Sequence, residues 1–312
     1  MAGIWTMGEI LVEIMRPRAE MALHQTGEFL GPFPSGAPAI FIDTVARLGH
    51  PAGIIGGVGE DDFGRCVLDR LQADGVECRY VGRYPGAATA VAFVTYFEDG
   101  SRKFLYHIDR TPAVWARFDG SEDLGRPDFF HVMGCSLMAN EDFRLEILKA
   151  AQCVFQQGGR ISFDPNIRPE LLRGRPLEDV IGPLLERCAV LLPGVAELAL
   201  LSGVEDPIQG ANRLLERYPL EAIVLKRGKH GCTLLTRAAP LDIPAYPVQE
   251  VDPTGAGDCF DAGFLVGMLE GRSLTDCARL ASAAGALNAQ AFGPMEGSIS
   301  RSRVSAVTGF SF

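Results

Sequence analysis

Six apolar runs of strand length recur along the chain, and helix-like segments separate them. The runs are GEILVEIM, AGIIGGVG, DFFHVMG, RISFDPN, CAVLLPG and AIVLKRG. Continuous apolar runs are typical of strands in a parallel sheet that helices cover on both faces. The alternation therefore predicts an α/β fold with a mostly parallel, Rossmann-like sheet and helices on both faces. We expect functional groups at the carboxyl edge of that sheet, where its loops emerge.

One stretch departs from this alternation. Residues 88–106 contain two β-rich runs joined by Glu98-Asp99-Gly100-Ser101, and an Asp-Gly pair between such runs is typical of a hairpin. Together with the Gly- and Pro-rich piece at residues 31–36, this hairpin predicts a small sheet outside the main one. We expect a single domain over residues 1–312, with a lid formed by segments of about 15–36 and 86–110.

Composition excludes several classes of function. The net charge of −10 argues against a general nucleic-acid or membrane-surface binder, because both kinds of partner select basic faces. The eight cysteines lack C-x-x-C spacing, which predicts reduced core thiols and no zinc site or disulfide framework. The opening stretch MAGIWTMGEILVEIM carries acids and no basic leader, so we expect a first strand and a cytoplasmic protein.

The run VDPTGAGDCFDAGFLVG, residues 251–267, joins a small-residue turn to the start of an apolar helix. Gly255 and Gly257 let the backbone approach a ligand closely, and the helix presents unpaired amides to the same place. Asp258 stands at the junction, so an anion site beside a proton acceptor indicates phosphoryl transfer. The alternative is that Asp258 only stabilises the helix N-terminus. Walker A spacing is absent, and the glycines lie too near the C-terminus for a Rossmann dehydrogenase.

The segment DPTGAGDCFDAGF resembles the C-terminal signature of the ribokinase/PfkB-like carbohydrate kinases. SGAPAIFIDTVARLGHPAGIIGGVGEDDFGR resembles the other glycine motif of that family. The resemblance implies a ribokinase-like fold and Asp258 as the general base. It also implies that the amides of Gly255, Ala256 and Gly257 form an anion hole for the transferring phosphoryl group. ATP and Mg²⁺ are the implied cofactors, and the lid is implied to cover the sugar and to join two chains in a homodimer.

The resemblance also implies a sugar side, to which we assign Glu13, Gly36, Ala37, Tyr106, Asn166 and Asp258. Arg168, in FDPNIRPELL, is a candidate clamp on the transferring phosphoryl group, although an arginine before a proline on a surface loop is as often solvated. Two positions depart from the family. Ile40 stands where an asparagine is usual, and Glu13 stands where an aspartate is usual.

The implied nucleotide side comprises Lys226, Gly228, Gly231, Thr254, Gly255, Gly257, Ser282 and Gly285. Glu197, in LLPGVAEL, is implied to hold a Mg²⁺-bound water, although Gly194 replaces the family's asparagine. Some relatives bind a monovalent cation between the loop before the anion hole and the last loop. Asp252 and carbonyls near Ala289 and Gly293 are the candidate ligands here, and hard oxygen ligands make K⁺ chemically reasonable.

The acceptor is expected to be a neutral hexose or ketohexose, such as tagatose or fructose. The segments GEILVEIM and GPFPSGAPAIFIDTVARLG resemble the corresponding segments of tagatose or related ketohexose kinases. Glu13 brings a negative charge to the sugar side, and Ile108 supplies no cation for a substrate carboxylate. The alternatives are a 2-keto-3-deoxygluconate kinase, a nucleoside kinase, and a regulatory protein that binds sugar or nucleotide without turnover.

Overall fold

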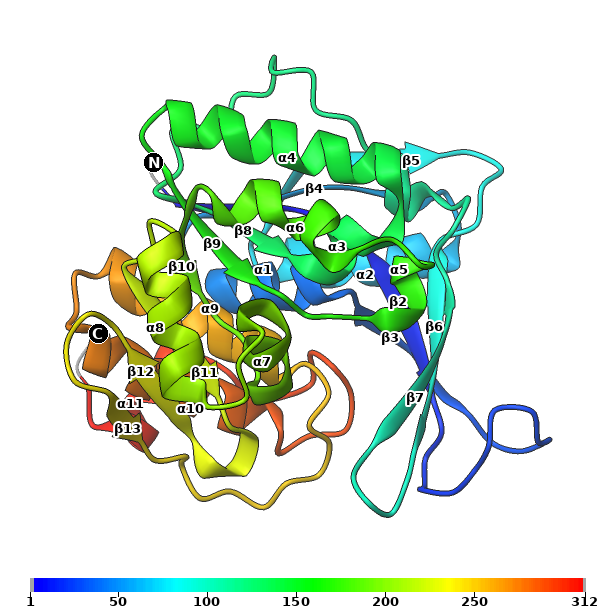
Figure 1. Ribbon diagram of the computed structural model, residues 1–312. Coiled ribbons are helices and arrows are strands. Elements are labelled where there is room, and N and C mark those ends of the chain that lie inside the picture. The colour runs from blue at the N-terminus through cyan, green and yellow to red at the C-terminus, as the bar shows by residue number, and fades with distance from the viewer. Residues whose placement is uncertain (1–2, 311–312) are drawn as a thin grey trace.

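The computed structural model describes residues 3–310, which form a nine-stranded main sheet, a four-stranded small sheet, and helices on both faces of the main sheet (Figure 1). The main sheet has the order β13-β12-β11-β10-β9-β8-β1-β4-β5. Neighbouring strands from β5 to β11 are parallel, and β12 and β13 are antiparallel additions at one edge. The predicted mostly parallel α/β fold is therefore confirmed. The strands are β1 (Ile4–Met7), β4 (Ala52–Gly59), β5 (Glu77–Tyr84), β8 (Phe129–Met133), β9 (Arg160–Asp164), β10 (Cys188–Leu191), β11 (Ala222–Lys226), β12 (Cys232–Leu235) and β13 (Leu241–Ile243).

Two helical layers cover this sheet. Helices α4, α7 and α8 pack against β8, β9 and β11 on one face, whereas α1, α2 and α10 pack against the strands on the other, with α9 between α1 and α10 (Figure 1). The helices are α1 (Ala37–Arg47), α2 (Asp62–Ala73), α3 (Gly134–Ala139), α4 (Glu141–Gln156), α5 (Pro169–Leu172), α6 (Leu177–Leu185), α7 (Val195–Ser202), α8 (Pro207–Arg217), α9 (Ala256–Leu269), α10 (Leu274–Asn288) and α11 (Arg301–Thr308). Within residues 3–310, none of these helices has the length and apolar character needed to cross a membrane.

The run GEILVEIM does not belong to the main sheet, and that part of the sequence interpretation is wrong. The first main-sheet strand is β1, whereas Leu11–Met15 forms β2 of the small sheet. The chain passes between the sheets at Gly8, where a Cβ atom would lie 2.2 Å from the Cγ of Pro38. Glu13 therefore stands on a strand of the small sheet.

The small sheet has the order β3-β2-β6-β7, with β3 at Leu30–Ser35, β6 at Ala90–Tyr96 and β7 at Arg102–His107. Strands β6 and β7 form the expected hairpin, with Tyr96 opposite Arg102. In Figure 1 this hairpin extends beyond the main body beside the loop between β2 and β3. The small sheet is thus placed to border the carboxyl edge of the main sheet.

Candidate active site

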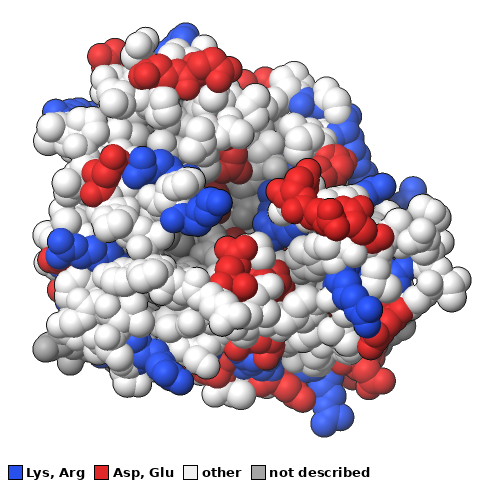
Figure 2. All heavy atoms as spheres, turned by 90° about the horizontal axis from the view of Figure 1, so that it is seen from below, with Lys and Arg blue, Asp and Glu red and all other residues white. Residues whose placement is uncertain are grey.

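A cavity of about 210 Å³ opens between the small sheet and the carboxyl edge of the main sheet. Figure 2 shows a face that is hollowed near its centre, with acidic and basic side chains around the hollow. The residues expected at the site that line this cavity are Glu13, Gly36, Ala37, Tyr106, Asn166, Arg168, Glu197, Lys226, Thr254, Gly255, Gly257 and Asp258. The structure therefore brings together groups from both sheets and from the starts of α1 and α9.

A second cavity of about 620 Å³ adjoins the first, and Lys226, Pro253 and Gly257 line both. The other expected nucleotide residues in its wall are Gly228, Gly231, Ser282 and Gly285, and Ala256 also contributes to it. Ligands in the two cavities would meet only at this shared boundary. The start of α9 lies there.

The turn before α9 requires glycine at Gly255 for two reasons. Its φ of 78° lies in the left-handed region, and a Cβ atom would lie 2.3 Å from the carbonyl oxygen of Pro294.

The three amides expected to form an anion hole are not equivalent, because the Ala256 amide donates to the carbonyl of Pro253 at 3.2 Å. The Gly255 and Gly257 amides have no acceptor within residues 3–310, so these two are free to bind an anion.

Asp258 lies in the first turn of α9, with 8% of its surface exposed. The side-chain amide of Asn166 donates to its Oδ1 atom at 3.3 Å. Burial, followed by the nearby charge of Asp164, raises the pKa of Asp258 to about 8. Asp258 therefore retains a proton at neutral pH and becomes a proton acceptor as the pH approaches 8.

Lys226, at the end of β11, lies between two buried carboxylates. Its Nζ atom donates to Asp164 Oδ2 at 2.8 Å and to Asp261 Oδ1 at 3.1 Å. Burial alone would lower the pKa of Lys226, but Asp164 and Asp261 raise it above its ordinary value. A Cβ atom on Gly257 would lie 3.8 Å from Nζ, which places the ammonium beside the turn whose amides are free to bind an anion. Sequence interpretation missed Asp261, although its spacing of three from Asp258 on a helix was a signal.

Arg168 also belongs to the cavity wall. Its Nε atom donates to the hydroxyl of Tyr106 at 3.3 Å, and Nη1 donates to the carbonyl of Ile167 at 3.1 Å. The guanidinium carbon lies 5.9 Å from the centre of the Phe104 ring. Arg168 is half-buried and lines the cavity, so it is not the solvated surface arginine that the sequence had left as an alternative.

The side of the cavity where the sugar was expected holds buried acceptor atoms without donors. Ser35 donates to Glu13 Oε1 at 2.7 Å, whereas Glu13 Oε2 has no hydrogen-bond partner in the described part of the chain. Asn166 Oδ1 is likewise buried and unpartnered there. Burial raises the pKa of Glu13 to about 7. Buried acceptors are costly unless a donor reaches them, so these two favour a ligand that carries hydroxyl groups.

Two further lining residues were missed from the sequence. Glu9 is buried and accepts hydrogen bonds from Ser136 Oγ at 2.5 Å and Cys135 Sγ at 3.1 Å. Arg102, on β7, donates to the hydroxyl of Thr254 at 3.1 Å. Both line the first cavity, and the sequence gave a signal only for Glu9, which is the first acid of the GEILVE run.

Glu197 lines the same cavity, with both carboxylate oxygens bound to backbone. Oε2 accepts from the Gly194 amide and Oε1 from the Ile167 amide, each at 2.7 Å. The carboxylate thus joins the loop after β9 to the start of α7. Each oxygen keeps a further lone pair. The group is therefore still suited to accept a hydrogen bond from a metal-bound water.

Asp252 is the centre of a group of hydrogen bonds around the turn. Its Oδ1 atom accepts from the Thr254 amide at 3.0 Å, the Thr254 hydroxyl at 2.7 Å and the Tyr96 hydroxyl at 3.2 Å. Its Oδ2 atom accepts from the Gly293 amide at 3.0 Å. Asp252 thus connects the small sheet, the turn before α9 and the last loop.

Residues 7–301 match the model of a family described as pfkB family carbohydrate kinase. Among relatives of this chain, the fructokinase of Salmonella typhimurium is 31% identical over 301 residues, which cover 94% of this chain and 95% of the relative. The fructokinase of Klebsiella pneumoniae is 32% identical over 266 residues, which cover 85% and 84% of the two chains.

Solved structures show the same fold. A putative ribokinase II from E. coli, in complex with ATP and Mg²⁺, has a TM-score of 0.90 and 38% identity, with 98% of this chain and 99% of that chain covered. A double mutant of the fructokinase from Vibrio cholerae O395, with fructose, ADP and potassium ion bound, has a TM-score of 0.87 at 24% identity, with 99% and 98% covered. At that identity, the second likeness concerns the fold alone.

Proposed function

The chain belongs to the pfkB family of carbohydrate kinases, and we propose that it transfers the γ-phosphoryl group of ATP to a hydroxyl of a neutral hexose or ketohexose. Fructose and tagatose are the preferred candidates. The observation that carries the proposal is the junction of the two cavities at the start of α9. There Asp258, the free Gly257 amide and the ammonium of Lys226 surround one point.

Asp258 acts in this proposal as the general base. It takes the proton of the acceptor hydroxyl while that oxygen attacks the γ-phosphorus and ADP leaves. Asn166 holds the Asp258 carboxylate in place by its hydrogen bond. The amides of Gly255 and Gly257, with Lys226 and Arg168, stabilise the charge on the transferring group. Ala256 contributes to the shape of the turn.

ATP fits the second cavity with its phosphates toward Lys226. Gly228, Gly231, Ser282 and Gly285 would hold the nucleoside end, and Thr254, which lines the first cavity, would approach the phosphates from that side. Mg²⁺ would neutralise charge on those phosphates. Glu197 would hold it through a water, because both of its oxygens already accept backbone donors at 2.7 Å and keep one lone pair each.

The acceptor is proposed to be neutral because two carboxylates, Glu9 and Glu13, line the sugar cavity. The unpartnered oxygens of Glu13 and Asn166 suit hydroxyl donors. The cavity also contains Arg168 and Arg102, of which the sequence interpretation had considered only Arg168 as a partner for a substrate carboxylate. Arg102 donates to Thr254 and Arg168 donates to Tyr106, so a neutral hydroxyl positions each guanidinium while its other N–H donors stay available to hydroxyl or phosphoryl oxygens. The fructokinase relatives support the same choice.

Three further proposals concern the domain and its lid, the oligomeric state, and the location of the protein. The whole chain is one ribokinase-like domain, and its small sheet is a lid that closes over the sugar. Two lids join in a homodimer, for which the exposed Leu105 on the edge strand β7 offers an apolar contact. We also place the protein in the cytoplasm, and its net charge of −10 argues against nucleic-acid or membrane-surface partners.

The test is kcat/KM with ATP over tagatose, fructose, ribose, 2-keto-3-deoxygluconate and adenosine. We expect the largest value for a ketohexose. A preference for 2-keto-3-deoxygluconate would overturn the neutral substrate and assign Arg102 or Arg168 to its carboxylate. Turnover of none of the five, with ATP still bound, would favour the regulatory alternative.

A further inference from the structure

We propose that the side-chain amide of Asn288 takes the place of the monovalent cation expected between the turn before α9 and the last loop. The activity of this chain would then be independent of K⁺. The inference rests on the proposed kinase function for its kinetic test. It also has a stability test that needs no activity.

Asn288 is the last residue of α10 and is fully buried. Its Nδ2 atom donates to the carbonyl of Thr254 at 2.8 Å and to the carbonyl of Pro294 at 3.0 Å. Thr254 precedes Gly255 of the anion site, and Pro294 belongs to the last loop. The two protons of one amide therefore join the same two segments that a cation would join through their carbonyl oxygens.

The other expected ligands already face donors. Both oxygens of the Asp252 carboxylate accept hydrogen bonds, from Thr254, Tyr96 and Gly293. The carbonyl of Ala289 accepts the amides of Val251 at 2.8 Å and Asp252 at 3.2 Å. A cation placed among these oxygens would meet the positive ends of N–H and O–H dipoles. The groups present at this position therefore do not fit K⁺.

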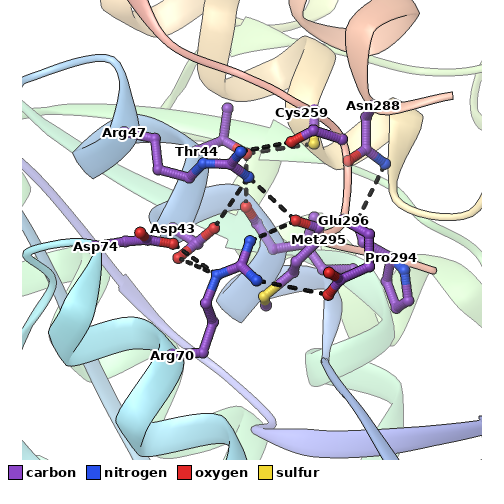
Figure 3. Close-up of polar contacts among 12 residues, drawn as sticks. Asp43, Thr44, Arg47, Arg70, Asp74, Cys259, Asn288, Pro294, Met295 and Glu296 are labelled. Carbon is purple, nitrogen blue, oxygen red and sulfur yellow. Dashed lines mark hydrogen bonds and ion pairs between the residues drawn. The ribbon is translucent and has the colours of Figure 1, made fainter. Parts of the chain in front are cut away.

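Fixed positive charges hold the last loop from its other side. Arg47 Nη1 donates to the carbonyl of Met295 at 3.1 Å, and Arg70 Nη2 donates to the same oxygen at 2.5 Å. Figure 3 shows both guanidinium groups directed at this loop, with the buried Asp43 carboxylate 3.7 Å from Arg47 and 3.9 Å from Arg70. Figure 3 also shows the contact of Asn288 with Pro294. The chain thus supplies from its own side chains the positive charge that would hold this loop.

The orientation of the Asn288 amide follows from its neighbours. Its Oδ1 atom is buried without a partner among residues 3–310. If the amide were reversed, Oδ1 would face two carbonyl oxygens and repel them. A reversed amide is stable only around a cation, so K⁺ dependence is the outcome that separates the two orientations.

The first experiment compares the wild-type protein in K⁺ and in tetramethylammonium at equal ionic strength. We expect equal kcat, equal KM for ATP and equal melting temperature. An ion that binds the native state raises its melting temperature by mass action. Activation of about fivefold or more, the lower end of ordinary coupling between sites, would overturn the proposal. A K⁺-dependent rise in melting temperature would do the same even if no sugar were turned over.

The second experiment uses Asn288→Ser, which removes the amide and leaves the two carbonyls without their shared donor. We expect this variant to gain K⁺ activation of about fivefold or more. Asn212→Ser, on the exposed face of α8, is the matched control and should stay independent of K⁺. An Asn288→Ser protein that folds and is equally active in both ions would contradict the proposal. If it does not fold, the wild-type comparison decides alone.

Discussion

The ammonium of Lys226 lies 2.8 Å from the carboxylate of Asp164, at the boundary of the two cavities. Asp261 approaches the same ammonium from α9 at 3.1 Å. Removing one partner of a buried ion pair leaves an uncompensated charge, which costs more than the pair contributes. Breaking the pair should therefore destabilise the end of β11 and, under the proposed function, should also remove the cation that Lys226 would present to the transferring group.

Lys226→Met should lower the free energy of unfolding by about 3–5 kcal/mol, because Asp164 and Asp261 lose their shared cation. Urea denaturation measures this effect. Lys149→Met, on the exposed face of α4, is the control and should be close to neutral. Adding Asp261→Asn to Lys226→Met should recover part of the loss. No recovery would mean that the charges are not the cause.

Asp258→Asn should lower kcat by about 10²- to 10⁴-fold, because an amide cannot take the hydroxyl proton. The affinity for ATP should be nearly unchanged in calorimetric titration, since Asp258 is not part of the second cavity. Asp179→Asn, an exposed change on α6, provides the comparison. A variant at Asp258 with the kcat of the wild type would remove this residue from the chemistry.

The raised pKa of Asp258 predicts a pH dependence with a definite sign. The folded protein retains the Asp258 proton up to about pH 8, whereas the ordinary value of an aspartate is 3.8. The wild-type protein therefore loses the contribution of this group as the pH rises between those values. Relative to the wild type, Asp258→Asn should become more stable from pH 5 to pH 9, as measured by urea denaturation.

Over the same pH range, kcat/KM of the wild-type protein should rise, because the base must be ionised. A difference in stability that is flat with pH would show that Asp258 is ionised throughout.

An alanine in the left-handed conformation costs about 1 kcal/mol relative to glycine. Gly255→Ala should destabilise the protein by more than this amount. The added methyl group would also press on Pro294, 2.3 Å away. Gly271→Ala is the matched control, because Gly271 has a φ of 68° and no atom within 4 Å of its Cβ position. Equal losses of stability in the two variants would show that the turn moves away from Pro294 without cost.

Closure of the lid should protect the amides of β6 and β7 from hydrogen exchange when sugar is bound. The β4 strand, which is already buried, serves as the internal reference. Unchanged exchange in residues 90–107 at saturating sugar would argue against closure. Light scattering of the same sample tests the proposed dimer separately.

The residue pattern predicted those parts of the fold and site that depend on local sequence. Strands β4 and β8–β11 follow from uninterrupted apolar runs, and the turn before α9 follows from its glycines and Asp258. The prediction that GEILVEIM belongs to the main sheet failed, because an apolar run indicates a buried strand without indicating which sheet contains it. Gly8, where the chain changes sheet, is a close contact with Pro38 that no local pattern encodes.

The missed groups depend on contacts between distant segments. Arg102 meets Thr254 across 152 positions of sequence, and Asn288 meets Thr254 across 34. Asn288 lies in a run of small apolar residues, where a single amide gives no signal until its two acceptors are in place. The hydrogen bonds of Asp252 were not predicted for the same reason, because its four donors come from three separate segments.

These shared hydrogen bonds of Asp252 have a consequence for how the chain tolerates substitution. Tyr96 and Thr254 donate to the same oxygen, so removing one donor changes what the other contributes. Residues with a common partner show non-additive effects, whereas distant residues add. We therefore expect substitutions at Tyr96 on β6 and at Thr254 in the turn before α9 to be epistatic, so that a change in the small sheet alters which residues the turn tolerates.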